Sequence, residues 1–122
     1  MMNSSWLVIM TKPRMEIEAK KHLIRQGIEA YLPLWKELKK RSGAWETIVS
    51  PMFSRYLFAR QSYEDQSLSS VRSTRGVSGL VHFGKEPAWA SDKLINDIRV
   101  FESIQINQTD QLKPFKKGDQ VL

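Results

Sequence analysis

The stretch PMFSRYLFAR, residues 51–60, reads as a β-strand that is rich in aromatic side chains. It begins with a proline, which cannot donate a ladder hydrogen bond and therefore suits the start of a strand. Side chains alternate across a strand, so Tyr56 and Phe58 are predicted to share one face, and Leu57 and Ala59 the other. The aliphatic face is suited to cover by helices, whereas the aromatic face is predicted to stay open as a docking surface.

A basic turn, VRSTRGV, follows at residues 71–77 and is rich in hydroxyl groups. Arginine side chains neutralise phosphates, and hydroxyl groups donate hydrogen bonds to them. Exposed rings near a basic loop indicate a protein that acts on another macromolecule rather than on a metabolite.

The segments before the aromatic strand predict a strand, a helix and a second strand. Residues 6–10, WLVIM, form an apolar run that is typical of a buried central strand. Residues 14–26 carry apolar side chains at helical spacing, and Gly27 supplies a C-terminal cap. Residues 28–34 read as a strand that is interrupted by a proline.

An inserted hairpin is predicted next. Residues 35–41 and 45–50 read as two strands around the turn signal Ser42-Gly43. A helix over residues 35–41 is the alternative.

The C-terminal half is predicted to hold two helices, a strand and a linker. A short helix is expected within residues 62–71, and a strand over residues 77–83. Ser91 or Asp92 caps a helix with an apolar face at helical spacing, and residues 103–114, which are polar and aperiodic, read as a linker.

The element order predicts an α+β fold. It is a ferredoxin-like or split-βαβ open antiparallel sheet of about four strands, flanked by about three helices, with an inserted β-hairpin. Residues 1–102 are expected to form one domain and residues 103–115 a linker. Residues 116–122 are expected to begin a second, truncated domain, because an apolar strand end without a partner is an improbable natural terminus.

The composition predicts a nucleic-acid-binding protein of the cytoplasm. The 122 residues carry a net charge of +6, which favours a polyanionic partner; a basic, solvated surface is the alternative. The absence of cysteine excludes disulfides and thiolate sites. No apolar stretch approaches the ~18 residues that span a bilayer, and no signal-peptide pattern is present, so no membrane association is expected.

No catalytic residue, cofactor or metal site is predicted. His22 and His82 are far apart and lack the spacing of zinc ligands. No cluster of carboxylates or histidines indicates a nuclease. A single-strand-binding module of the RRM type is an alternative, because exposed rings on an open sheet can stack bases, but the RNP1 pattern is missing.

Several segments resemble the N-terminal domain of the NusG family of transcription elongation factors, and most closely its antiterminator branch, RfaH. They are the strand through Trp6, the helix through His22, PMFSRYLF at residues 51–58, STRGVSGLVHFG at residues 73–84 and PA at residues 87–88. The form TRGV followed by FG is similar to the RfaH branch, and KKGDQVL resembles the opening of the family's C-terminal KOW barrel.

The resemblance implies a monomer that binds the clamp helices of the largest subunit of RNA polymerase and suppresses pausing. In RfaH-like members it also implies recognition of the non-template DNA strand of a paused complex. The implied polymerase-binding residues are Met10, Phe53, Tyr56, Phe58, Phe83 and Ile95, with Ser67, Ser69 and Ser70 toward a loop across the channel. Burial in the core is the alternative for the apolar residues, and turn or capping roles are the alternative for the serines.

The implied DNA-binding residues, called the basic patch below, are Lys12, His22, Arg25, Arg72, Ser73, Thr74 and Arg75. Pro13, Met15 and Glu18 stand where the RfaH branch tends to carry basic or amide side chains. A solvated helix face, with Glu18 as an ion-pair partner, is the alternative for the helical part of the patch.

Overall fold

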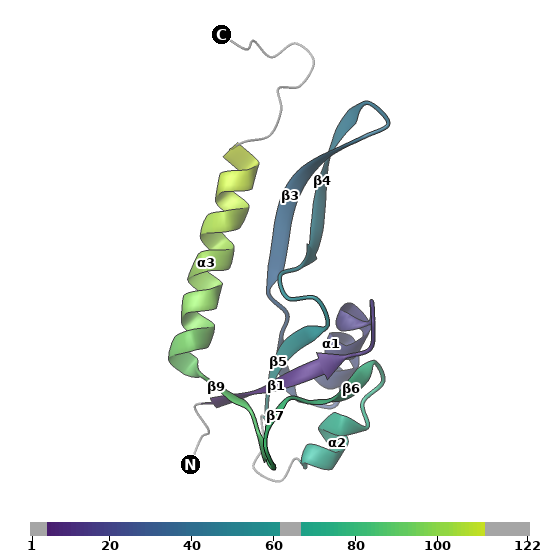
Figure 1. Ribbon diagram of the computed structural model, residues 1–122, viewed down its shortest axis with the longest axis vertical. Coiled ribbons are helices and arrows are strands. Elements are labelled where there is room, and N and C mark those ends of the chain that lie inside the picture. Colours follow the sequence, from purple (N-terminus) through teal and green to yellow (C-terminus); the bar gives the residue numbers. More distant parts are fainter. Residues whose placement is uncertain (1–4, 62–66, 112–122) are drawn as a thin grey trace.

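The computed structural model describes residues 5–61 and 67–111. An antiparallel sheet carries helices on both faces, and a long hairpin and a long helix extend from it side by side (Figure 1). The strands are β1 Ser5–Thr11, β2 Glu29–Tyr31, β3 Leu34–Arg41, β4 Ala44–Pro51, β5 Tyr56–Arg60, β6 Val77–Leu80, β7 His82–Phe83, β8 Glu86–Pro87 and β9 Trp89–Ser91, and the helices are α1 Glu16–Arg25, α2 Leu68–Arg72 and α3 Asp92–Gln111.

Strand β1 is the centre of the main sheet, whose order is β2-β5-β1-β6 with β9 also paired to β1. β5 runs antiparallel along one edge of β1 and places Ala59 opposite Leu7. The other edge is shared by β9, which pairs with residues 5–7, and β6, which pairs with residues 9–11. Because β5 separates β1 from β2, the predicted split βαβ arrangement is confirmed, and β9 adds a fifth, short strand to the four expected.

The aliphatic face of the sheet packs against α1 and α2, as predicted. Leu57 and Ala59 are fully buried there beside Ala19 and Leu23 of α1, because α1 turns its apolar stripe toward the sheet. The whole cluster contains Leu7, Ile9, Ala19, Leu23, Ile28, Leu32, Leu57, Ala59, Val71, Val77 and Leu80.

The aromatic face is partly covered by α3. Ile95 of α3 packs with Trp6, Phe58 and Ala90 in a second buried cluster. Phe58 is therefore only 7% exposed, and the prediction that it stays open is wrong, whereas Tyr56 at the start of β5 remains 39% exposed. α3 docks on the large side chains of this face because their burial removes apolar area from water.

The strand predicted over residues 51–60 is shorter than expected. Pro51 ends β4 instead of starting the aromatic strand, and β5 begins at Tyr56. The chain turns in between, where Arg55 has a φ of 70°. Its backbone N–H donates to Glu16 Oε2 at 2.8 Å and its Nε donates to the Thr11 carbonyl at 3.0 Å, so these bonds hold the turn against the start of α1.

The predicted hairpin is confirmed, and the helical alternative for residues 35–41 is wrong. β3 and β4 pair in one continuous register from Leu34 opposite Pro51 to Arg41 opposite Ala44. Ser42 and Gly43 have φ values of 51° and 81°, the left-handed conformations that a two-residue hairpin loop requires.

Helix α3 continues through residue 111, so the prediction of a linker is wrong for residues 103–111; residues 112–122 lie outside the described residues. Its second half is held by polar contacts to the edge of β3. Glu102 Oε2 accepts from the Leu34 N–H at 2.7 Å, and Gln105 Oε1 accepts from the Lys36 N–H at 3.0 Å. Thr109 Oγ1 donates to the Lys36 carbonyl at 2.9 Å. Hydrophobic periodicity does not reveal such contacts, which explains the missed helix.

The cap after α1 and the short helix α2 agree with the sequence, whereas the predicted strand over residues 77–83 is divided and the short strands β8 and β9 were not predicted. Gly27 follows α1 with a φ of 82°, as a C-terminal cap requires, and α2 is the short helix expected in its region. The strand predicted over residues 77–83 divides at Val81: β6 ends at Leu80, and residues 82–83 form β7 of the β7–β8 hairpin. The Val81 N–H still donates to the Val8 carbonyl of β1 at 2.9 Å. Within the described ranges, no helix is both long and apolar enough to span a membrane.

Candidate docking groove and nucleic-acid interface

An apolar groove lies where α3 crosses the aromatic face of the sheet. It has a volume of ≈ 380 Å³, and all of its lining side chains are aliphatic or aromatic. The lining residues are Val8 from β1, Phe53 from the turn before β5, Tyr56 and Phe58 from β5, and Leu94 and Ile98 from α3. A concave surface without charged groups is suited to receive an apolar ridge from another protein.

The floor of the groove is fixed, whereas its rim is exposed. The Phe58 ring contacts Phe53 edge-on and stacks on Tyr31, with both pairs of ring centroids 6.4 Å apart. Tyr56, Phe53 and Leu94 form the rim and are 39%, 40% and 47% exposed. These three side chains supply most of the apolar area that a partner can remove from water.

Polar bonds at the start and in the middle of α3 set the position of the groove wall. Trp6 Nε1 donates to Asp92 Oδ1 at 2.9 Å at the start of the helix. The Tyr31 hydroxyl donates to Glu102 Oε1 at 2.6 Å farther along. Burial, and then the hydrogen bond to Glu102, raise the pKa of Tyr31, so its hydroxyl keeps the proton that it donates. The wall of the groove is therefore pre-organised by residues that lie outside it.

Three of the apolar residues predicted to bind a partner lie in the groove, and three do not. Phe53, Tyr56 and Phe58 line it. Met10 is half-buried in β1 opposite Tyr56, beside the groove and outside its lining. Ile95 is 1% exposed in the core beneath α3, which agrees with the alternative of core burial, and Phe83 is 77% exposed on β7, away from the lining.

Sequence reasoning missed three residues of the groove, namely Val8, Leu94 and Ile98. Helical spacing places Leu94 and Ile98 on the apolar face of the last helix but does not assign them to the docking surface. Val8 alternates with Leu7 and Ile9, so its position on the aromatic face follows from strand parity. The sequence does not reveal where α3 crosses the sheet, and that position decides which residues of both elements line the groove.

The three serines predicted to face a second polymerase loop lie at the start of α2. Ser67 is the N-cap, and its Oγ accepts from the Ser70 N–H at 3.1 Å. The hydroxyls of Ser67 and Ser70 are also 3.0 Å apart. Ser67 therefore caps the helix, Ser70 supplies the N–H that is capped, and Ser69 is exposed beside them.

The basic patch is assembled by a close contact between residues 72–76 and α1. Gly76 has a φ of 90°, and a Cβ added there would lie 3.1 Å from the Ala19 backbone nitrogen. The Lys12 N–H donates to the Gly76 carbonyl at 2.8 Å. Only glycine permits this approach, which brings Lys12 beside the basic loop.

Thr74 is a structural member of the patch. It is 6% exposed, and its hydroxyl donates to the Ser70 carbonyl at 2.8 Å. The same hydroxyl accepts from Gln26 Nε2 at 2.7 Å, which ties the loop to the end of α1. Thr74 is thus covered, and its prediction as a DNA contact is corrected to a positioning role.

The other members of the patch are accessible. Lys12, Arg25, Arg72, Ser73 and Arg75 are exposed, and His22 is partly exposed with Nε2 3.4 Å from Glu18 Oε2. In the part of the chain that the structure describes, no carboxylate forms an ion pair with Arg72 or Arg75. Their charges are therefore available to a phosphate backbone, whereas Glu18 competes for His22.

The described residues contain no group of three or more histidine, cysteine, aspartate or glutamate side chains placed to hold a metal ion. The RRM-like alternative is weakened by the cover over Phe58, since base stacking needs rings on an open sheet face.

Comparison with known protein families finds a match for most of the chain. A family model described as "Transcription termination factor nusG" matches residues 4–99, which includes both the groove and the basic patch. Factors of this family act in transcription elongation and termination and interact with RNA polymerase. The matched region spans most of the 122 residues, so the chain belongs to the NusG family of transcription factors.

Proposed function

We propose that this domain is an antitermination factor that docks through the apolar groove on the clamp helices of RNA polymerase. The observation that carries the proposal is the groove itself, a concave apolar surface of ≈ 380 Å³ on a member of a polymerase-binding family. A pair of antiparallel helices presents ridges of apolar side chains, and such ridges fit a groove between a helix and a sheet. Tyr56, Phe53 and Leu94 at the rim are the proposed anchors, because aromatic and large apolar side chains dominate interface energies.

The basic patch is proposed to hold the non-template DNA strand. Lys12, Arg72 and Arg75 neutralise phosphates, and His22 and Ser73 offer groups that can reach an unstacked base. The two surfaces are close along β1, because Met10 pairs with Tyr56 at the groove rim and Lys12 follows two residues later. One rigid strand thus connects polymerase docking with DNA binding.

Assignment to the RfaH branch is part of the proposal. The residues TRGV at 74–77 and FG at 83–84 support it. Pro13, Met15 and Glu18 depart from that branch, and Glu18 holds His22 in an ion pair when His22 is protonated. A DNA element different from that of other RfaH-like factors is therefore expected.

The proposed mechanism is a brace across the polymerase cleft. The groove docks on one side of the cleft while the basic patch holds the displaced strand. A factor that binds the closed, elongating state more tightly than the open, paused state shifts the population by that difference in affinity. A threefold preference corresponds to about 0.65 kcal/mol, so modest contacts are enough to shorten a pause.

Pause lifetimes measure this function directly. Adding the domain to halted elongation complexes on a defined template should shorten the lifetime of a pause at least about twofold. The control is the Leu94→Glu variant, which should leave the lifetime unchanged because it cannot dock. Equal lifetimes with and without the wild-type domain, across templates with varied non-template sequence, would contradict the proposed function.

A second prediction concerns the salt dependence of DNA binding. The double variant Arg72→Gln and Arg75→Gln should bind single-stranded DNA more weakly, and the slope of log K against log salt should fall by about 0.7 for each phosphate that is no longer neutralised. Fluorescence anisotropy with a labelled oligonucleotide at several salt concentrations measures both quantities. The double variant Lys40→Gln and Arg99→Gln, which removes two exposed positive charges away from the patch, is the matched control. An unchanged slope in the double variant would rule out phosphate binding by this loop.

A further inference from the structure

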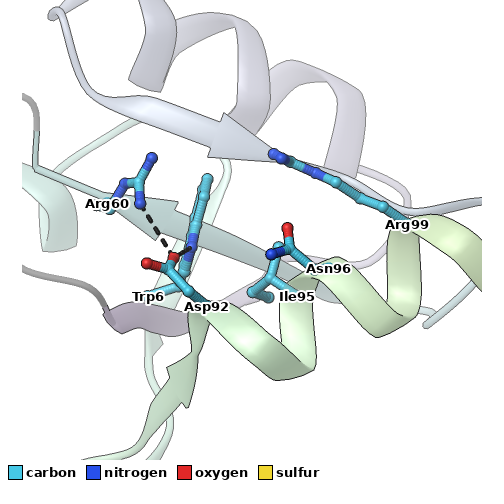
Figure 2. Close-up of a pocket in the computed structure, with 6 residues that line it drawn as sticks. All are labelled: Trp6, Arg60, Asp92, Ile95, Asn96 and Arg99. Carbon is cyan, nitrogen blue, oxygen red and sulfur yellow. Dashed lines mark hydrogen bonds and ion pairs between the residues drawn. The ribbon is translucent and has the colours of Figure 1, made fainter.

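A second concave site lies beside the N-terminal half of α3 (Figure 2), and it shares no lining residue with the apolar groove. This site, called the arginine notch, has a volume of ≈ 240 Å³. It is lined by Trp6, Arg60, Asp92, Ile95, Asn96 and Arg99. Figure 2 shows Arg60 and Arg99 on opposite sides of it, with Asn96 on α3 beside Arg99. The notch is polar, unlike the groove, so it is suited to a different kind of ligand.

Arg60 is a structural part of the notch. Its Nη1 donates to Asp92 Oδ1 at 3.1 Å, and its Nε and Nη2 donate to Glu29 Oε1 at 3.0 and 2.8 Å. The guanidinium also lies 4.4 Å from the centre of the Trp6 ring. Two carboxylates therefore neutralise Arg60, and it has little charge left to offer a ligand.

Arg99 is held in place but is not neutralised. Its guanidinium lies 4.7 Å from the Tyr31 ring centre and 5.5 Å from the Trp6 ring centre. In the described ranges it forms no ion pair with a carboxylate, and the residue is exposed. A guanidinium that two rings already orient loses little conformational freedom when it binds an anion, and its fork matches a carboxylate in two hydrogen bonds.

We propose that the arginine notch binds one carboxylate side chain, a glutamate or aspartate, of a protein partner. Arg99 supplies the bidentate donor and Asn96 a neutral amide donor beside it. The notch has room for the end of one side chain and is smaller than the apolar groove. The notch and the apolar groove have no lining residue in common, so this contact is separate from the docking proposed for the groove.

The surrounding charges favour a single carboxylate over a nucleic acid. Asp92 lines the notch and Glu29 borders it through its bonds to Arg60. Both would repel the successive phosphates of a polyanionic strand, whereas the exposed arginines of the basic patch pair with no carboxylate among residues 5–61 and 67–111. A single carboxylate bound at Arg99 would pair with that one guanidinium. The negative charge of Asp92 would repel it little, because Asp92 is already paired with Arg60.

The test is a titration followed by NMR, with N-acetylglutamate methylamide as the probe. The Trp6 indole Nε1–H and the Asn96 side-chain amide resonances report on the notch. The probe should shift both resonances in a saturable way, and N-acetylglutamine methylamide, its neutral isostere, should not. Arg99→Gln should weaken probe binding about tenfold, while Arg75→Gln, which removes the same charge from the basic patch, should leave it unchanged.

A second variant and two further probes complete the test. Asn96→Asp adds a negative charge at an exposed position of α3 and should also weaken probe binding about tenfold, followed on the Trp6 indole resonance, even if Arg99→Gln fails to fold. The proposal is overturned if the glutamine analogue shifts the resonances equally, or if both variants bind the probe as the wild type does. It is also overturned if inorganic phosphate or a thymidine oligonucleotide binds the notch more tightly than the glutamate probe.

Discussion

Leu94→Glu is expected to abolish binding to core RNA polymerase while the domain stays folded. Leu94 is 47% exposed at the rim of the apolar groove, so a glutamate there keeps its hydration in the free domain. Docking would strip that hydration without supplying a partner charge, which should weaken the complex at least about a hundredfold. The substitution suits the first turn of α3, where a negative charge interacts favourably with the helix dipole. Biolayer interferometry with core polymerase and no DNA measures the affinity.

Phe83→Glu is the matched control for this experiment. Phe83 is 77% exposed on β7 and lies outside the groove lining, so the same charge should change affinity little if the groove alone is the docking site. Equally weakened binding in the two variants would extend the docking surface to β7. Wild-type affinity in Leu94→Glu would remove the groove from the docking site.

Phe58→Ala is expected to lower the free energy of unfolding by about 3–5 kcal/mol. The Phe58 ring is 7% exposed, packs in the buried cluster with Trp6 and Ile95, and contacts the rings of Tyr31 and Phe53. Alanine would leave a cavity that α3 can close only by leaving its polar contacts to β3. Urea denaturation followed by far-ultraviolet circular dichroism measures the change in stability.

Tyr56→Ala separates binding from stability. Tyr56 lies at the rim and is 39% exposed, so its truncation should cost less than about 1.5 kcal/mol of stability while weakening polymerase binding by about 2 kcal/mol or more. A similar loss of stability in Tyr56→Ala and Phe58→Ala would mean that both rings belong to the core. Loss of binding in Phe58→Ala alone cannot identify the docking surface, because an unfolded domain also fails to bind.

Much of the fold could be predicted because local rules and tertiary structure agree. The apolar stripe of α1, the cap at Gly27 and the left-handed turn at Ser42-Gly43 each specify their element within a few residues. The second half of α3 could not be predicted in this way. Glu102, Gln105 and Thr109 stabilise it through backbone groups of β3 that lie about 70 residues earlier, and such contacts leave no periodic signal.

The part of the candidate site that could be predicted is the part that depends on which face of the sheet each strand residue occupies. Parity placed Tyr56 and Phe58 on one face, but only the docking of α3 decides which ring is covered. Thr74 carries the same kind of side chain as an exposed DNA contact, and its burial follows from the Gln26 bond across the loop. The arginine notch has no signature in the sequence, since its residues come from β1, β5 and α3.

The polar contacts from α3 to β3 also bear on how copies of this chain behave at high concentration. An unpaired strand edge is a template on which another chain can add a strand. Glu102, Gln105 and Thr109 fill the hydrogen-bonding positions at Leu34 and Lys36 that an incoming strand would need. α3 thus protects the start of β3 from pairing with a strand of another chain. The protection comes from side chains that bond to specific backbone groups of Leu34 and Lys36.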